Sequence, residues 1–121
     1  MARLRVLEVS KSTGGLGTYM RWLAQGIDTE RFEPTFACLS DNGKELSVEL
    51  ARFPGVKSVY WPMNRFKINL AGDALLILRI ARLLRGNKFD VVHGHGSKAG
   101  FIVRLAAIGT SVRVAYSPHG F

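Results

Sequence analysis

The sequence predicts an α/β protein built on a Rossmann-like, doubly wound parallel sheet with helices on both faces. Five apolar, strand-like runs alternate with four segments of helical periodicity, and turns rich in Gly, Pro, Asn and Asp separate them. Right-handed crossovers between parallel strands favour the strand order 3-2-1-4-5. The loops after strands one, four and five then meet at the carboxyl edge of the sheet, where such folds form a ligand crevice.

The predicted elements follow one another closely, and 121 residues suffice for one domain, 1–121, with one core. The expected strands are 4–9, 33–40, 56–61, 89–93 and 112–117, and the expected helices are 18–27, 44–53, 69–85 and 97–108. Helix 69–85 has a broad apolar stripe that indicates burial against the sheet, and its charged residues interrupt it too often for a membrane span. Tyr19, Trp22 and Trp61 are expected to pack in the core or between helix and sheet.

The composition indicates in which compartment the protein works and which kinds of partner it binds. Cys38 is the single cysteine and lies in an apolar run, which predicts a buried thiol and a reducing compartment. The amino terminus enters a strand without a hydrophobic signal region, so we expect a cytoplasmic protein. The net charge of +8 favours anionic partners: phosphorylated substrates, anionic lipid head groups or an acidic partner domain. Nucleic acid is disfavoured because the basic residues are dispersed.

The loop after the first strand is rich in glycine, with Gly14, Gly15 and Gly17 just before the first helix. Glycines let the backbone approach a ligand closely, and the N–H groups of a helix start favour phosphate. A nicotinamide or flavin site is disfavoured, because Met20 stands where the dinucleotide motif has its third glycine. A Walker-type site is excluded because no Gly-Lys-Ser/Thr follows. A tight turn without a ligand remains the structural alternative.

Three histidines lie in the predicted crevice. His93 and His95 alternate along a strand end and so point to one face, which suggests a metal site with His119 as the third ligand. No Asp, Glu or Cys motif accompanies them, so we predict no metal site. We expect His93 to be partly buried with its hydrogen bonds satisfied and His95 to line the crevice. A hydrolase that uses Ser97 and His119 is disfavoured, because no Gly-x-Ser-x-Gly motif occurs.

Three motifs in order resemble one protein family. The runs Asp90–Gly100 (DVVHGHGSKAG) and Tyr116–Phe121 (YSPHGF), together with the Gly14–Gly17 loop, are similar to the amino-terminal domain of retaining GT-B glycosyltransferases of family four, which build bacterial glycans. The resemblance covers essentially the whole chain. It implies transfer of a sugar, with retention of configuration, from a UDP- or GDP-sugar to a glycan or lipid-linked acceptor. It further implies that the nucleotide sugar is a co-substrate and that neither cofactor nor metal is needed.

The resemblance also implies roles for individual residues. His119 would act as the catalytic residue that contacts the transferred sugar, because a neutral imidazole can hydrogen-bond a sugar hydroxyl. Substrate and donor would lie against the two crevice loops, whose implied binding residues are Gly14, Gly15, Gly17, His95, Gly96, Ser97 and Lys98. Backbone N–H groups of the glycine loop would stabilise the charge that develops on the leaving phosphate. Lys98 would attract an anionic acceptor or a phosphate.

The family pattern continues beyond the point at which this sequence ends. We therefore expect a fragment that comprises the acceptor-binding half, with a carboxyl-terminal, nucleotide-binding domain absent and little catalysis by this half alone. The loop containing Arg65, Phe66 and Lys67 is a candidate contact for a membrane or an acceptor. The alternatives are a non-catalytic flavodoxin-like binding module and a basic binder of nucleic acid or another anionic ligand. The donor sugar, the acceptor and the oligomeric state do not follow from the sequence.

Overall fold

The computed structural model of the chain describes residues 3–11, 15–39, 43–62 and 70–118. Strands and helices alternate along the chain, as the periodicity predicts. The elements are β1 (Leu4–Lys11), α1 (Gly15–Gly26), β2 (Phe32–Leu39), α2 (Gly43–Leu50), β3 (Lys57–Trp61), α3 (Leu70–Gly86), β4 (Val91–His95), α4 (Ser97–Ala106) and β5 (Arg113–Ser117).

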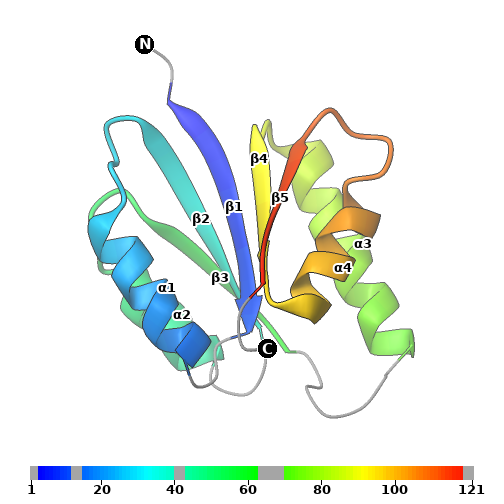
Figure 1. Cartoon of the computed structure of the whole chain (residues 1–121), viewed down its shortest axis with the longest axis horizontal. Helices are drawn as coiled ribbons and strands as arrows, with labels where there is room; N and C mark the ends of the chain where they lie inside the picture. Colours follow the sequence, from blue (N-terminus) through cyan, green and yellow to red (C-terminus); the bar gives the residue numbers. More distant parts are fainter. Residues whose placement is uncertain (1–2, 12–14, 40–42, 63–69, 119–121) are drawn as a thin grey trace.

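The five strands form one parallel sheet in the order β3-β2-β1-β4-β5, which confirms the predicted order. Helices α1 and α2 lie on one side of this sheet, and α3 and α4 lie on the other (Figure 1). This arrangement follows from right-handed crossovers that run from β1 toward β3 on one face and then return across β4 to β5 on the other. The carboxyl ends of β1, β4 and β5 therefore meet at one edge.

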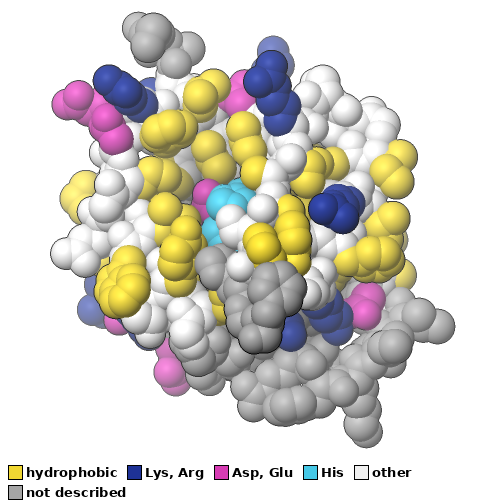
Figure 2. All heavy atoms as spheres, viewed as in Figure 1, with side chains coloured by type: hydrophobic (Ala, Val, Ile, Leu, Met, Phe, Trp, Pro, Cys, Tyr) yellow, Lys and Arg dark blue, Asp and Glu magenta, His cyan; other side chains and the backbone are white. Residues whose placement is uncertain are grey.

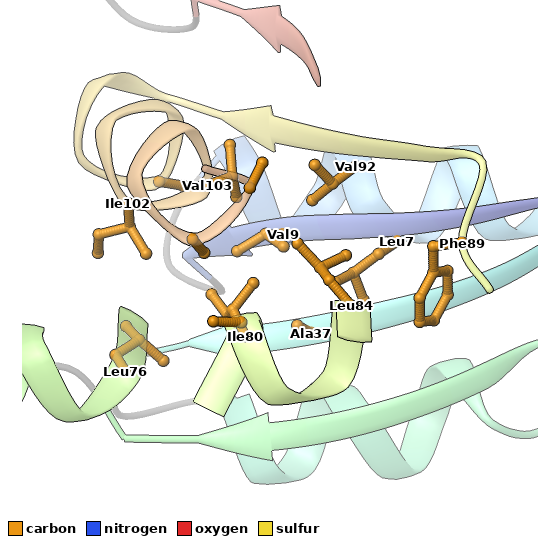
Figure 3. Packing of buried hydrophobic residues seen from close by; sticks show 14 of the residues in the cluster. Leu7, Val9, Ala37, Leu76, Ile80, Leu84, Phe89, Val92, Ile102 and Val103 are labelled. Carbon is orange, nitrogen blue, oxygen red and sulfur yellow. The ribbon is translucent and has the colours of Figure 1, made fainter. Parts of the chain in front are cut away.

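The larger hydrophobic core lies between the sheet and helices α3 and α4 (Figure 3). Leu7 and Val9 of β1 and Val92 of β4 point into it, and each is 0% exposed. Ile80 of α3 and Val103 of α4 face these strands from the helices. Alternate residues of a strand point to opposite faces, so the residues between them, such as Glu8 and His93, point toward the side of α1 and α2.

A smaller core fills the space beneath α1 and α2. Its buried members come from α1, β2, α2 and the residue just before β3: Met20, Ala24, Phe36, Cys38, Leu46, Leu50 and Val56. Cys38 is a free, buried cysteine, as its apolar surroundings predicted, and burial raises the pKa of its thiol to about 12. The thiol is therefore neutral at physiological pH and unreactive.

Trp22 corrects one expectation, because its side chain is 68% exposed and does not pack in a core. The buried face of α1 is defined by Gly17, Met20 and Ala24. Position 22 lies about 200° around the helix from Met20, on the side that faces solvent. Tyr19 and Trp61 are half-buried and pack against the smaller and the larger core respectively, as predicted.

Strand β4 (Val91–His95) begins and ends two residues later than the sequence indicated, and this shift matters for the site. The predicted strand ended at His93, whereas β4 continues to His95 and pairs with Ser10 of β1 and Ser117 of β5 at that position. His95 is therefore part of the sheet rather than of the loop that follows it. Gly94, between the two histidines, points toward α4.

Replacement of Gly94 with alanine is expected to lower the free energy of unfolding by about 1–3 kcal/mol, because a Cβ there overpacks the contact of β4 with α4. That Cβ would lie 2.9 Å from the Cα of Gly100 and 2.9 Å from Cγ2 of Val103. Urea denaturation measures the change. Gly86→Ala is the matched control, because a Cβ at Gly86 meets nothing within 4 Å. Equal stability of the two variants would contradict the close approach of α4 to β4.

Candidate functional site

Two histidines and one carboxylate meet on the α1 side of the sheet, near the carboxyl ends of the central strands. The ladder between β1 and β4 places Glu8 beside His93 and Ser10 beside His95. Because residues two apart on a strand share a face, the side chains of Glu8, His93 and His95 converge there. We call them the Glu8–His93–His95 cluster. Figure 2 shows histidine side chains near the middle of the viewed face, with an acidic side chain beside them.

The carboxylate of Glu8 joins the two imidazole rings. Its Oε2 lies 2.5 Å from Nε2 of His95 and 3.1 Å from Nδ1 of His93. An ionised carboxylate only accepts hydrogen bonds, so both nitrogens donate to it in this arrangement. Nε2 of His93 then accepts from the hydroxyl of Ser117, at 2.6 Å. A chain of polar contacts thus runs from β1 through β4 to the end of β5.

Burial and electrostatics give the cluster its character. His95 is 0% exposed and Glu8 is 4% exposed, and the ring of Tyr19 on α1 lies 5.4 Å from that of His95, between ring centroids. Burial raises the pKa of Glu8, but hydrogen bonds and electrostatic attraction from His93 and His95 outweigh it, so that its pKa lies below the ordinary value of 4.5. Glu8 is therefore ionised at neutral pH.

The structure also brings the first turn of α1 close to the turn between β4 and α4. Gly15 opens α1, where a Cβ would meet nothing within 4 Å, so its backbone is open to a ligand. Gly96 has a φ of +86°, and a Cβ built on it would lie 3.7 Å from Leu16 in the first turn of α1. The Gly96 N–H donates to the carbonyl of Ser117 at 3.0 Å. The ends of β1, β4 and β5, where the three predicted crevice loops begin, therefore lie close together.

The other predicted site residues have different surroundings. Gly17 is buried on the side of α1 that faces the sheet, whereas Ser97 is exposed at the start of α4. Nζ of Lys98 lies 3.2 Å from Asp73 of α3, so an acceptor would share this cation with a carboxylate. Gly14, His119 and the loop containing Arg65, Phe66 and Lys67 lie outside the described residues.

Two expectations about the histidines need correction. His95 was expected to line the crevice, but it is fully buried beneath α1 and holds Glu8. The histidines were also expected to have no acidic companion, whereas Glu8 contacts both. His93 is half-buried with both ring nitrogens engaged, as predicted. The signal for Glu8 was a single carboxylate inside the apolar run of the first strand, with strand four expected beside it.

The ligand atoms of Glu8, His93 and His95 all lie within 4.8 Å of one another, so these three residues could hold a metal ion. In the part of the chain that the structure describes, no helix is long and apolar enough to cross a bilayer.

The fold is a doubly wound sheet, a class in which ligands bind at the carboxyl ends of the strands, and the Glu8–His93–His95 cluster lies near those ends. Residues 14–121 match the model of the family described as "Glycosyl transferase 4-like domain". The chain belongs to this family. The resemblance noted from the motifs at 90–100 and 116–121 is thereby confirmed.

Two curated relatives are similar to part of the chain. The UDP-Gal:alpha-D-GlcNAc-diphosphoundecaprenol alpha-1,3-galactosyltransferase of Escherichia coli is 34% identical over 67 residues, which cover 54% of this chain and 17% of the relative. An uncharacterized 41.2 kDa protein in the cps region of Klebsiella pneumoniae is 41% identical over 58 residues, which cover 44% of this chain and 16% of the relative. The matched part thus spans about a sixth of each relative's length.

Solved structures share the fold at low identity. A glycosyltransferase from Rickettsia africae matches with a TM-score of 0.78 and 18% identity, over 100% of this chain and 31% of that one. An epimerase from Listeria monocytogenes, described as a putative UDP-N-acetylglucosamine 2-epimerase, matches with a TM-score of 0.65 and 16% identity, over 96% and 31%. The carboxyl-terminal domain of a Pyrococcus furiosus hydrogenase matches with a TM-score of 0.64 and 16% identity, over 97% and 94%. This range of proteins means that the sheet alone does not define an activity.

Proposed function

We propose that this chain is the acceptor-binding domain of a retaining glycosyltransferase that transfers a sugar from a UDP- or GDP-sugar to a glycan or lipid-linked acceptor. The family match over residues 14–121 is the observation that carries the proposal. The name of the Escherichia coli relative supports it, because that enzyme takes galactose from UDP-Gal to a saccharide on diphosphoundecaprenol. The nucleotide sugar serves as co-substrate, and a second domain of the same enzyme binds its nucleotide.

In this proposal the crevice at the ends of β1, β4 and β5 holds the reacting groups. His119 contacts the transferred sugar, and the N–H groups around Gly14 and Gly15 face the donor diphosphate or the acceptor. Two features of the described residues support such a crevice: the backbone at Gly15 is open, and Gly96 approaches Leu16. The side chain of His95 is buried, so in this proposal it does not touch the substrate and instead holds Glu8 in position.

The proposal also includes association with the inner face of a membrane. The net charge of +8 would draw the domain toward anionic head groups and toward a diphosphate-linked acceptor. This location agrees with a lipid-linked substrate of the kind that the Escherichia coli relative's name describes.

A sugar-transfer assay on the product of the complete gene tests the proposal. A panel of nucleotide sugars is offered with a lipid-linked diphosphate acceptor, and His119→Ala is expected to lower kcat by about tenfold or more, because it removes a contact to the sugar. Arg31→Ala is the control. Arg31 is exposed and directly precedes β2, at the amino-terminal ends of the strands and away from the crevice. The 121-residue chain by itself is expected to bind the acceptor without transferring sugar.

The other outcomes are equally informative. If no nucleotide sugar is bound or consumed, the transferase proposal is wrong, and a steep salt dependence of DNA or RNA binding would favour the basic nucleic-acid binder instead. If the His119→Ala variant matches its parent while transfer is observed, the role of His119 is wrong and the transferase proposal stands.

A further inference from the structure

We propose that Glu8, His93 and His95 form a binding site for one divalent transition-metal ion of the Zn²⁺ class, which joins β1 to β4. The inference does not rest on the proposed function, since it concerns a buried cluster beside the crevice and not the contacts of the sugar. It rests on the convergence of three ligand groups, on the hydrogen bond between His93 and Ser117, and on the burial of the site.

The three groups come from a rigid part of the fold. Glu8 lies on the central strand, and both histidines lie on the neighbouring strand, so the ladder between β1 and β4 fixes their spacing. Oε2 of Glu8 is 2.5 Å from Nε2 of His95 and 3.1 Å from Nδ1 of His93. Around tetrahedral zinc, with bonds of about 2.0–2.2 Å, neighbouring ligand atoms are about 3.3 Å apart. The rings of His93 and His95 lie 3.9 Å apart between centroids. To admit the ion, the two rings must rotate apart by about 1 Å, and the contacts to Glu8 must open by a similar distance.

Ser117 provides the hydrogen-bond partner that a metal-bound His93 needs on its other ring nitrogen. A histidine that binds a metal usually donates the hydrogen on its other nitrogen to a neighbouring acceptor, which fixes the ring and its tautomer. Nε2 of His93 lies 2.6 Å from Oγ of Ser117. Binding of the ion would move the ring hydrogen of His93 from Nδ1 to Nε2, where the Ser117 oxygen accepts it, and would leave the lone pair of Nδ1 for the metal. The carbonyl of Ser117 is itself held by the N–H of Gly96, at 3.0 Å.

The ligand set selects the metal. Two imidazoles and one carboxylate suit Zn²⁺, Fe²⁺, Co²⁺ or Ni²⁺, whereas Mg²⁺ and Ca²⁺ prefer sites made of oxygen alone. His95 is 0% exposed, while the side chain of His93 is 21% exposed, so the ion and a completing water enter from the side of His93. The single negative charge of Glu8 offsets half of the charge of the ion. A bound ion would hold the carboxyl ends of β1, β4 and β5 together.

Metal titration of the 121-residue chain tests this proposal directly. After treatment with a chelator and its removal, the chain is expected to bind one equivalent of Zn²⁺ by calorimetry, and Co²⁺ is expected to produce visible absorption bands of a nitrogen and oxygen site. Glu8→Gln and His95→Asn should each weaken binding by about 100-fold, because each removes a ligand. Ser117→Ala should weaken it by about tenfold, because it removes only the outer partner.

His119→Ala is the matched control, since it removes the one histidine outside the cluster. This variant is expected to bind Zn²⁺ as the parent does. Circular dichroism checks that each variant is folded, and the parent offers a readout that needs no variant. In ¹⁵N spectra of its imidazoles, Zn²⁺ should shift Nδ1 of His93 and Nε2 of His95.

Absence of saturable binding would overturn the proposal and leave the cluster as a hydrogen-bonded network. Binding that survives both Glu8→Gln and His95→Asn, or that His119→Ala abolishes, would overturn it as well. These titrations contain no nucleotide sugar and no acceptor. Failure of the metal site therefore leaves the transferase proposal intact, and failure of sugar transfer leaves the metal site intact.

Discussion

Replacement of Phe36 with alanine is expected to lower the free energy of unfolding by about 3–5 kcal/mol, the range for removal of a buried aromatic ring. Phe36 is 0% exposed and is among the largest fully buried side chains of the described residues. It stands on β2, beneath α1 and α2, in the smaller of the two cores. The two helices and the sheet cannot close fully over the space that it leaves, so the loss of contacts adds to the loss of hydrophobic burial.

Equilibrium unfolding in urea, followed by circular dichroism, measures this change. Trp22→Ala is the control, because it removes a larger side chain that is 68% exposed, and its effect is expected within about 0.5 kcal/mol. A loss at Trp22 as large as that at Phe36 would mean that α1 presents a different face to the sheet than the one defined by Met20 and Ala24.

Replacement of Glu8 with leucine is expected to lower the free energy of unfolding by about 2–5 kcal/mol, since it leaves two imidazole N–H groups without their acceptor. A buried donor left unsatisfied costs about 1–3 kcal/mol. His95 is 0% exposed, so water cannot replace the lost contact there. Glu8→Gln is the matched variant: it keeps the shape and one acceptor oxygen, and it should lose less. All samples contain a chelator, so that no metal contributes.

Acidification tests the same residue in the parent chain. The pKa of Glu8 in the folded chain lies below 4.5, so its contribution to stability is present above that pH and is lost as the pH falls through the folded value. Unfolding free energies measured from neutral pH downward should therefore fall more steeply in the parent than in Glu8→Gln. Equal slopes would show that the Glu8 carboxylate is not stabilised by its histidine partners.

The element order was predictable because it depends on local pattern. Runs such as Leu4–Val9 and the broad stripe of the helix at 69–85 have periodicities that a strand and a helix each require. Crossover handedness then leaves few strand orders, and 3-2-1-4-5 is the one observed. The glycine loop and the two histidine motifs were recognisable as family features for the same reason, because each is a short, contiguous run.

The candidate site was only partly predictable. The sequence located His93 and His95 at the end of a strand, and the loops on either side of the crevice. It did not extend β4 to His95, because the ladder that includes this residue is completed by Ser10 and Ser117 of the neighbouring strands. It also expected Trp22 to be buried, since an isolated tryptophan in an amphipathic helix does not reveal which face meets the sheet.

By itself, the sequence determined the class of fold, the strand order and the family, because alternation, turns and short motifs are local properties of the chain. Only the tertiary structure decided that Glu8 contacts His93 and His95, because this contact depends on the register between two strands that are far apart in the sequence. A shift of one residue in that register would turn Glu8 away from the histidines and toward the opposite face of the sheet. Long-range register is set by the packing of the whole domain, and the chemistry of this buried cluster follows from it.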